Sequence, residues 1–109
     1  MHSIVFQALA DPTRREIVAA LKRGELPVND LVKRLDIHQS GVSRHLRILQ
    51  EAGFVRVRPH GQQRLYSLRA EPFRELETWV SGYRLLWEAR LDRFALALEK
   101  KQKSRESKP

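Results

Sequence analysis

The chain has 109 residues, the size of one ordinary domain. Its 21 lysines and arginines outnumber its 13 aspartates and glutamates, and the formal net charge of +8 points to an anionic partner, with nucleic acid first. The absence of cysteine excludes disulfide frameworks, thiolate nucleophiles and metal sites built on sulfur. No stretch reaches the ~18 consecutive apolar residues of a membrane span, and the first residues lack a signal-peptide pattern, so we expect a cytoplasmic protein with no membrane partner.

The positive charge lies mainly in two segments. Residues 37–69 carry six basic and one acidic side chain, and residues 100–109 carry five and one. The second segment contains no apolar residue, which predicts a basic disordered tail after a folded domain over residues 1–99. Such a tail either remains a solvated terminus or binds phosphates without sequence preference.

Two helices open the chain. Apolar residues at helical spacing predict a first helix over residues 3–10. Asp11 and Pro12 then suit the N-cap and the first position of a second helix, which we expect to end before Gly24. Arg14 and Arg15 fall on the polar face of this second helix, opposite its apolar stripe.

A pair of helices follows at the spacing of a helix-turn-helix. Residues 28–35 have apolar side chains at positions i, i+3, i+4 and i+7, which predicts a short amphipathic helix. A tight turn over residues 36–38 leads to a longer helix that ends near Gly53. The inward stripe of this longer helix is predicted to consist of Val42, Leu46 and Leu49.

The next segment predicts a basic β-hairpin, which we call the wing. Residues 54–58 alternate apolar and basic side chains, residues 59–62 have the composition of a turn, and residues 64–68 form the returning strand. An isolated hairpin is marginal in water, so its apolar residues must lean on the helices. The whole pattern predicts a mostly α-helical fold with a small β-hairpin wing, a winged helix-turn-helix with five helices.

From Pro72 to Leu98, apolar residues recur every three or four positions, which predicts one long terminal helix. About 27 residues span ~40 Å, more than a small domain covers with its own core. We therefore expect a homodimer joined through the first and last helices, with a last helix folded back on its own domain as the alternative. The predicted dimer interface consists of Val5, Leu9, Phe73, Leu76, Val80, Tyr83, Trp87, Leu91 and Phe94. The aromatic residues Trp79, Tyr83 and Trp87 either pack within this stripe or line an apolar ligand pocket.

The outward face of the second helix-turn-helix helix carries the candidate DNA-binding residues. Gln and Arg make bidentate contacts with adenine and guanine edges, and Ser reaches either a base or a phosphate. The candidates for base contacts are Gln39, Ser43 and Arg44, and those for phosphate contacts are Ser40, Arg47 and His38. For His38 the alternative is a solvated side chain with no contact to DNA. On the wing, where arginine suits a narrow minor groove, the candidates are Arg56, Arg58, Gln62 and Arg64. His45 is expected to have a structural role or to contact a phosphate.

Four motifs together resemble the ArsR/SmtB family of bacterial winged helix-turn-helix repressors, over essentially all of residues 3–99. These motifs are Leu9-Ala10-Asp11-Pro12-Thr13-Arg14-Arg15, Val42-Ser43-Arg44-His45-Leu46-Arg47-Ile48-Leu49, Glu51-Ala52-Gly53-Phe54-Val55, and Gly61 followed by Tyr66-Ser67-Leu68. The resemblance implies a dimeric, promoter-binding transcriptional regulator, usually a repressor, with its first and fifth helices at the dimer interface.

Two departures from the family concern its metal sites. Metal-sensing members carry cysteines at the start of the third helix, where this chain has Glu25-Leu26-Pro27-Val28-Asn29-Asp30. Other members use Asp and His pairs on the last helix, which here contains no histidine. The chain is therefore similar to the metal-independent, SdpR-like branch, and we expect no metal site and no cofactor. No small-molecule effector follows from the resemblance.

The residues and the resemblance together predict a sequence-specific regulator that binds an inverted repeat in double-stranded DNA as a homodimer. We expect no enzymatic activity, because Ser43 and His45 do not face each other and no carboxylate pair or glycine-rich phosphate loop is present. The alternatives are an architectural protein that binds any duplex and a winged-helix module that binds protein or RNA. The ratio of affinities for an operator and for random duplex distinguishes the sequence-specific regulator from the architectural protein.

Overall fold

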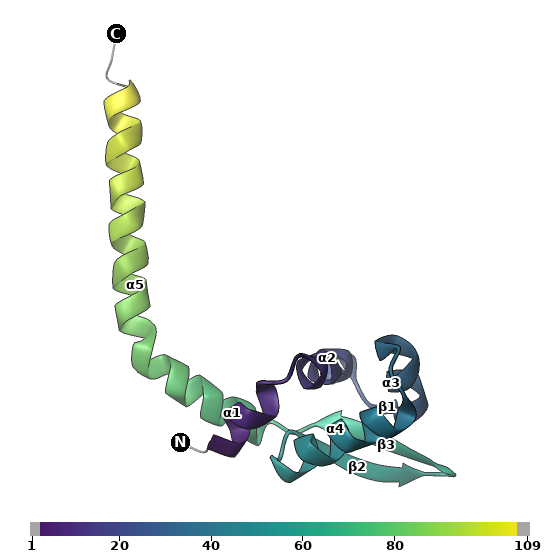
Figure 1. The fold of residues 1–109 in the computed structure, drawn as a ribbon. Coiled ribbons are helices and arrows are strands. Elements are labelled where there is room, and N and C mark those ends of the chain that lie inside the picture. The colour runs from purple at the N-terminus through teal and green to yellow at the C-terminus, as the bar shows by residue number, and fades with distance from the viewer. Residues whose placement is uncertain (1–2, 107–109) are drawn as a thin grey trace. The chain divides into compact units, whose positions relative to one another are not determined.

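The computed structural model describes residues 3–106, which divide into two compact units between Glu75 and Leu76. The first unit contains four α-helices, a short 3-10 helix and three strands, and the second contains most of a fifth α-helix (Figure 1). Within the described residues, the five α-helices and the hairpin confirm the predicted winged helix-turn-helix fold.

Helix α1 (Ser3–Leu9) and helix α2 (Pro12–Ala20) meet at a corner formed by Asp11. The Asp11 carboxylate accepts a hydrogen bond of 3.0 Å from the backbone N–H of Arg14, and Pro12 lies in the first turn of α2. This geometry confirms the predicted N-cap. The 3-10 helix η1 (Leu21–Arg23) then ends at Gly24, as the sequence predicts.

Helix α3 (Val28–Leu35) and helix α4 (Gln39–Glu51) form the helix-turn-helix. The chain leaves α3 through Asp36, which adopts a left-handed conformation with φ 52°. Its N–H donates to the carbonyl of Val32 at 3.0 Å, which satisfies one of the last carbonyls of α3. Asp tolerates this conformation better than most residues do, so the turn closes without a glycine.

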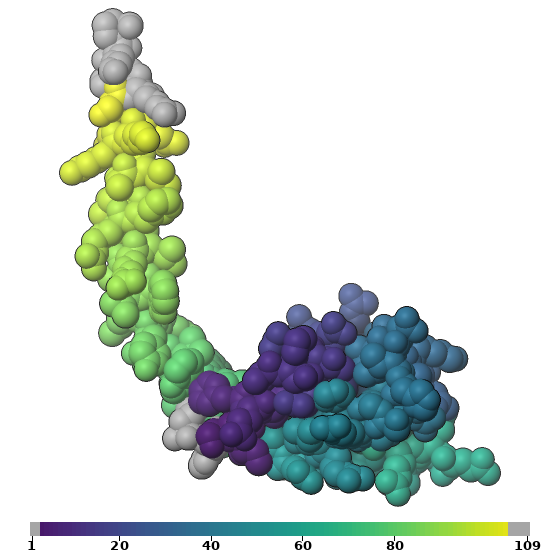
Figure 2. Space-filling view, viewed as in Figure 1, coloured from purple at the N-terminus to yellow at the C-terminus, as the bar shows by residue number. Residues whose placement is uncertain are grey.

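The core of the first unit is aliphatic with one aromatic pair. Its largest fully buried side chains are Ile17, Leu31, Val42, Leu46, Leu49, Phe54 and Val55. Each contributes about 1.5–3 kcal/mol through removal of apolar surface from water. The rings of Phe54 and Phe73 meet edge to face with centroids 5.3 Å apart. The α4 stripe is therefore buried as predicted, inside the closely packed body seen for this unit in Figure 2.

The wing consists of β2 (Val55–His60) and β3 (Gln63–Leu68), which pair as an antiparallel hairpin. His60 pairs with Gln63, so the turn has two residues, and Gly61 at its first position has φ 63°. A glycine with positive φ at this position is typical of a type II′ turn. The predicted four-residue turn over 59–62 was therefore two residues too long, because Pro59 and His60 continue the edge strand β2.

A third strand, β1 (Leu26–Pro27), completes the sheet in the order β1-β3-β2. Leu26 pairs with Tyr66, and Pro27 pairs with Leu65. Sequence analysis did not predict β1, because two residues that include a proline have no strand periodicity. The strand holds the start of α3 against the wing.

Helix α5 (Glu71–Glu106) has 36 residues, nine of which are in the segment 98–106. The prediction that the helix ends near Leu98 was wrong. Residues 100–106, which were predicted to belong to a disordered tail, are part of α5. Residues 99–106 contain no Gly or Pro and consist mainly of Lys, Gln, Arg and Glu, which are good helix formers even without an apolar face. Residues 107–109 of the predicted tail lie outside the described residues.

Candidate nucleic-acid interface

Helix α4 presents one polar face to solvent because its other face is buried. Val42, Leu46 and Leu49 are each no more than 1% exposed, which fixes the rotation of the helix against the core. The exposed side chains on α4 include Gln39, Ser40, Ser43, Arg44 and Arg47. The structure therefore places all five predicted α4 contacts at the surface.

The N-terminus of α4 lacks a side-chain cap. His38 occupies the N-cap position, and its side chain makes no capping hydrogen bond. Its ring nitrogen Nδ1 lies 3.3 Å from the hydroxyl of Ser40 instead. The carbonyl of His38 accepts from the N–H groups of Gly41 and Val42, at 3.0 and 3.1 Å. Backbone N–H groups at a helix start attract phosphate oxygens, so His38 and Ser40 lie where a backbone contact is favourable.

The wing turn and the starts of the two helices border one cleft. A cleft of about 220 Å³ is lined by Pro27, Val28, Asn29, Gln39, Gln62, Gln63 and Arg64. It brings together Gln39, Gln62 and Arg64, which the sequence predicted from separate elements. Asn29 also lines this cleft with an exposed side chain, and it was missing from the predicted set. Asn29 could have been predicted from its position, because it lies in the first helix of the helix-turn-helix and this helix crosses the DNA backbone.

Arg58 differs from the other predicted wing contacts. Its guanidinium donates three hydrogen bonds to the Glu25 carboxylate, from Nε at 2.8 and 3.1 Å and from Nη2 at 2.6 Å. These bonds hold the pKa of Glu25 below its ordinary value and raise the pKa of Arg58. Arg56 and Arg64 are exposed and make no ion pair within residues 3–106. The unpaired positive charge of the wing is thus carried by Arg56 and Arg64.

The corner between α1 and α2 holds contacts that sequence analysis missed. The Arg14 guanidinium donates to the carbonyls of Gln7 and Ala8 at 2.9 and 2.6 Å, and Arg15 donates to the carbonyls of Leu9 and Ala10. The polar face of α2 is therefore engaged with the end of α1 rather than only solvated. The motif around Asp11 gave a signal for the cap, but a carbonyl partner cannot be identified from residue types.

His45 lies at the same corner. Its Nδ1 is 3.4 Å from Nη1 of Arg14 and 3.9 Å from a carboxylate oxygen of Asp11. The His45 side chain is 22% exposed, so most of it faces the protein. The geometry gives His45 the structural role that was one of the two sequence expectations.

The chain is similar to known DNA-binding proteins in sequence and in fold. A helix-turn-helix domain family matches residues 9–58. The transcriptional repressor SdpR of Bacillus subtilis (strain 168) is 33% identical over 79 residues, which cover 72% of this chain and 88% of SdpR. The crystal structure of the ArsR family transcriptional regulator RHA00566 superposes with a TM-score of 0.71 at 36% identity, over 79% of this chain and 94% of that chain. The chain belongs to the ArsR family of winged helix-turn-helix transcriptional regulators.

A further relative adds weight to the DNA-binding half of this ArsR-family chain. The HTH-type transcriptional regulator Rv2034 of Mycobacterium tuberculosis (strain ATCC 25618 / H37Rv) is 46% identical over 63 residues. The match covers 58% of this chain and 59% of Rv2034. The match to the helix-turn-helix domain family, over residues 9–58, includes α3, α4 and the first residues of β2.

The predicted dimer residues of this ArsR-family chain fall into two groups. Val5 is only 3% exposed and packs in the core of its own first unit, where Phe73 also contacts Phe54. Leu9 and Leu76 are half-buried. The remaining predicted residues are exposed on α5, namely Val80, Tyr83, Trp87, Leu91 and Phe94. The exposed members of the predicted set are thus all on α5, and α1 adds the exposed side chains of Ile4 and Phe6.

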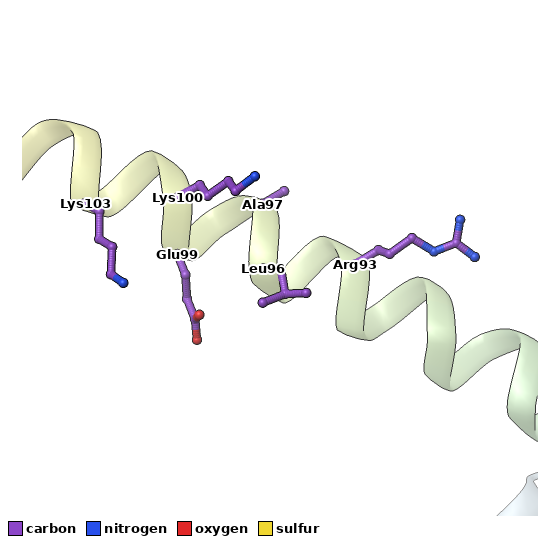
Figure 3. Close-up of a pocket in the computed structure, with 6 residues that line it drawn as sticks. All are labelled: Arg93, Leu96, Ala97, Glu99, Lys100 and Lys103. Carbon is purple, nitrogen blue, oxygen red and sulfur yellow. The ribbon is translucent and has the colours of Figure 1, made fainter.

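Two aromatic contacts occur along this part of α5. The rings of Trp79 and Tyr83 lie 5.2 Å apart, and the Arg90 guanidinium lies 5.7 Å from the Trp87 ring centre. Further along α5, Figure 3 shows Arg93, Leu96, Ala97, Glu99, Lys100 and Lys103 around a shallow pocket. All six residues belong to α5, so this pocket is an open part of the surface of one helix and not an enclosed cavity.

Across residues 3–106, no three His, Asp or Glu side chains are grouped as they would be around a metal ion. In the same range, no helix is both long and apolar enough to cross a membrane.

Proposed function

We propose that the protein is a homodimeric transcriptional repressor that binds an inverted-repeat operator through α4 and the wing, without a metal ion. The observation that carries the proposal is the polar face of α4. The side chains of Gln39, Ser43 and Arg44 are exposed on this helix and make no side-chain hydrogen bond or ion pair with other described residues. Side chains with unused hydrogen-bonding groups, on a helix whose other face is packed in the core, are suited to contact base edges.

The chemistry of these side chains divides the contacts. Arg44 has the planar fork that matches guanine O6 and N7, and Gln39 has the paired groups that match adenine N6 and N7. Ser43 lies one turn from Gln39 and reaches either a base or a phosphate. His38, Ser40 and Arg47 flank these residues and are assigned to the phosphates, which fix the register of the protein on the duplex. Arg56, Gln62 and Arg64 extend the contact to the neighbouring minor groove.

The dimer is supported by the exposed apolar stripe on α5. Tyr83, Trp87 and Leu91 are each about half exposed or more in the single chain. Burial of such large aromatic and aliphatic side chains against a second copy of the chain removes apolar surface from water and therefore stabilises a dimer. A symmetric dimer places two α4 helices in successive major grooves ~34 Å apart, which accounts for an inverted-repeat operator. The name of the relative SdpR, a transcriptional repressor, supports repression over activation.

Metal independence is supported by the segment that leads into α3. Residues 25–30 contain no cysteine, and the Glu25 carboxylate is occupied by the three hydrogen bonds from Arg58. A carboxylate held by a guanidinium is a poor ligand because the cation competes with the metal ion. We therefore propose that Zn²⁺ or Ni²⁺ leaves operator affinity unchanged.

An architectural role is the second candidate. It is favoured by the basic end of α5, where Lys100, Lys101 and Lys103 extend the helix past its apolar stripe. Contacts of this kind bind phosphates of any sequence and weaken steeply with salt. In either role we propose that the protein acts on DNA in the cytoplasm and not as an enzyme.

Fluorescence anisotropy distinguishes the two candidates. The purified chain is titrated against duplex DNA from its own upstream region and against scrambled duplex of the same length, each at two salt concentrations. A repressor binds the upstream DNA more tightly by a factor of ~10³ or more at physiological salt. Equal and steeply salt-dependent binding to both duplexes contradicts sequence-specific repression at this site and favours the architectural role.

A further inference from the structure

The Arg14 side chain connects three elements of the first unit. Its Nε donates to the carbonyl of Ala8 at 2.6 Å, and its Nη2 donates to the carbonyl of Gln7 at 2.9 Å. Its third nitrogen, Nη1, lies 3.4 Å from Nδ1 of His45. Arg14 itself is anchored in α2 through the Asp11 cap. One guanidinium therefore joins the end of α1 and the start of α2 to the middle of α4.

Arginine is suited to this position in a way that lysine is not. Two of its nitrogens donate to carbonyl oxygens and the third lies beside the His45 ring nitrogen, and the planar fork holds the three directions fixed. The last carbonyls of α1 are the negative end of that helix, and α1 has no basic residue in its own last turn. Arg14 supplies the missing cation and donors from α2. A lysine ammonium is a single point and cannot reach all three groups at once.

His45 is the α4 residue at the other end of this connection, and its contact with Arg14 adds to the core packing of Val42, Leu46 and Leu49. It lies between Arg44, which faces solvent, and Leu46, which is buried. Successive residues of a helix differ by about 100° around the axis, so a rotation that moves Arg44 also pulls His45 away from Arg14. Productive contacts tolerate displacements of only about 0.5 Å and 10–20°. The contact between Arg14 and His45 therefore restrains the rotation on which base recognition depends.

We propose that Arg14 and His45 are positioning residues that transmit the placement of α1 to the recognition helix α4. Arg14 holds the carboxyl end of α1 and, through Nδ1 of His45, sets the rotation of α4 against the α1–α2 corner. A change in the placement of α1 therefore alters the fit of Arg44 to DNA, although Arg14 contacts no DNA itself. The effect on DNA rests on the proposed function, whereas the connection between the helices is independent of it.

Four variants of the full chain test this connection. Arg14→Lys keeps the charge and removes the fork, and His45→Leu removes the ring acceptor. His45→Gln retains an acceptor on a side chain of similar reach and serves as the conservative rescue. Arg15→Lys is the matched control, because Arg15 binds the carbonyls of Leu9 and Ala10 at the end of α1 and has no contact with α4 among its hydrogen bonds.

Operator affinity and random-duplex affinity are measured for each variant and for the Arg14→Lys, His45→Leu double variant. We expect each of these two single changes to lower operator affinity about tenfold, with less than about a twofold change on random duplex, since residues in one network act together. The double variant is expected to lose no more operator affinity than the single variant that binds the operator less tightly. His45→Gln is expected to keep most of the operator affinity that His45→Leu loses. Arg15→Lys is expected to bind the operator as tightly as the parent chain does. Additive losses, or an equal loss in Arg15→Lys, overturn the proposal.

Hydrogen exchange of the free protein separates this inference from the proposed function. Arg14→Lys and His45→Leu are expected to speed exchange in both the last turn of α1 and the middle of α4, whereas Arg15→Lys affects α1 alone. If the parent chain lacks an operator preference but exchange follows this pattern, repression fails and the connection stands. If the parent chain prefers its operator and α4 exchange is unchanged in both variants, the connection fails and repression stands. If Arg14→Lys does not fold, the connection is tested by comparing operator affinity and hydrogen exchange between His45→Leu and His45→Gln.

Discussion

The Glu25 carboxylate accepts three hydrogen bonds from the Arg58 guanidinium and so ties the wing strand β2 to the segment that precedes β1. Both side chains are partly open to solvent, so the pair adds little to stability. Its larger effect is on charge, because it neutralises one of the arginines that the sequence assigns to DNA. The wing therefore presents less positive charge to a phosphate backbone than its composition indicates.

Removal of the Glu25 charge is expected to change the salt dependence of DNA binding. In Glu25→Gln, Arg58 is no longer neutralised and adds about one phosphate contact. The slope of log K against log salt then steepens by ~0.9 on any duplex. Anisotropy titrations at four salt concentrations give the slope. Glu16→Gln, the same charge change at an exposed position of α2, is the control, and equal slopes in the two variants would contradict the prediction.

The Asp11 cap gives a pH-dependent prediction. The hydrogen bond from the Arg14 backbone N–H holds the pKa of Asp11 below its ordinary value. The stabilisation is therefore fully present above the ordinary aspartate pKa of about 3.9 and is lost as the pH falls through the lower folded-state value. Thermal unfolding followed by circular dichroism between about pH 6 and pH 2 measures this loss. Asp11→Asn still caps the helix but cannot titrate, so its profile is flatter in this range.

The same residue gives a test at neutral pH. Asp11→Ala removes the cap and is expected to lower the midpoint of thermal unfolding by ~4–8 °C, whereas Asp11→Asn lowers it much less. Equal midpoints for the Ala variant and the parent chain would show that the hydrogen bond from Arg14 does not stabilise α2.

Arg44→Ala is expected to weaken operator binding by ~1–3 kcal/mol because a bidentate base contact is lost. Binding to random duplex changes far less, so the specificity ratio falls. Arg23→Ala in η1 removes the same charge from another exposed position and serves as control in the same anisotropy assay. Unchanged operator affinity in Arg44→Ala would remove this residue from the base-contacting set.

The α5 stripe offers a matched pair of substitutions. Leu91 and Leu85 are both exposed, at 63% and 82%, but Leu91 belongs to the predicted interface and Leu85 lies on roughly the opposite face of the helix. Leu91→Glu is expected to shift sedimentation equilibrium toward monomer, because it buries a charge between two copies. Leu85→Glu leaves the dimer intact. A dimer of equal strength in both variants would place the interface elsewhere.

Local signals explain why much of this fold could be predicted. The Asp11 cap, the buried stripe containing Leu46 and the Gly61 turn each depend on residue type and short spacing, which a sequence displays directly. The surface position of Gln39 and Arg44 follows from the same stripe.

Contacts between distant residues explain what could not be predicted. Arg14 and His45 are 31 residues apart, and Arg58 and Glu25 are 33 apart, so nothing in the local pattern pairs them. Each of these arginines has an ordinary polar position in the sequence. The last turns of α5 differ from the sequence prediction for another reason. The absence of apolar residues after Leu98 predicts disorder, but Lys, Gln, Arg and Glu favour a helix there.

Both outer strands of the wing sheet contain a proline. Pro27 lies in β1 and Pro59 in β2, while β3 is enclosed between them. Neither outer strand offers an unbroken row of amides to a strand from another molecule, and β1 is only two residues long. The wing sheet is therefore a poor template for the addition of a strand from another copy, which disfavours aggregation through its edges.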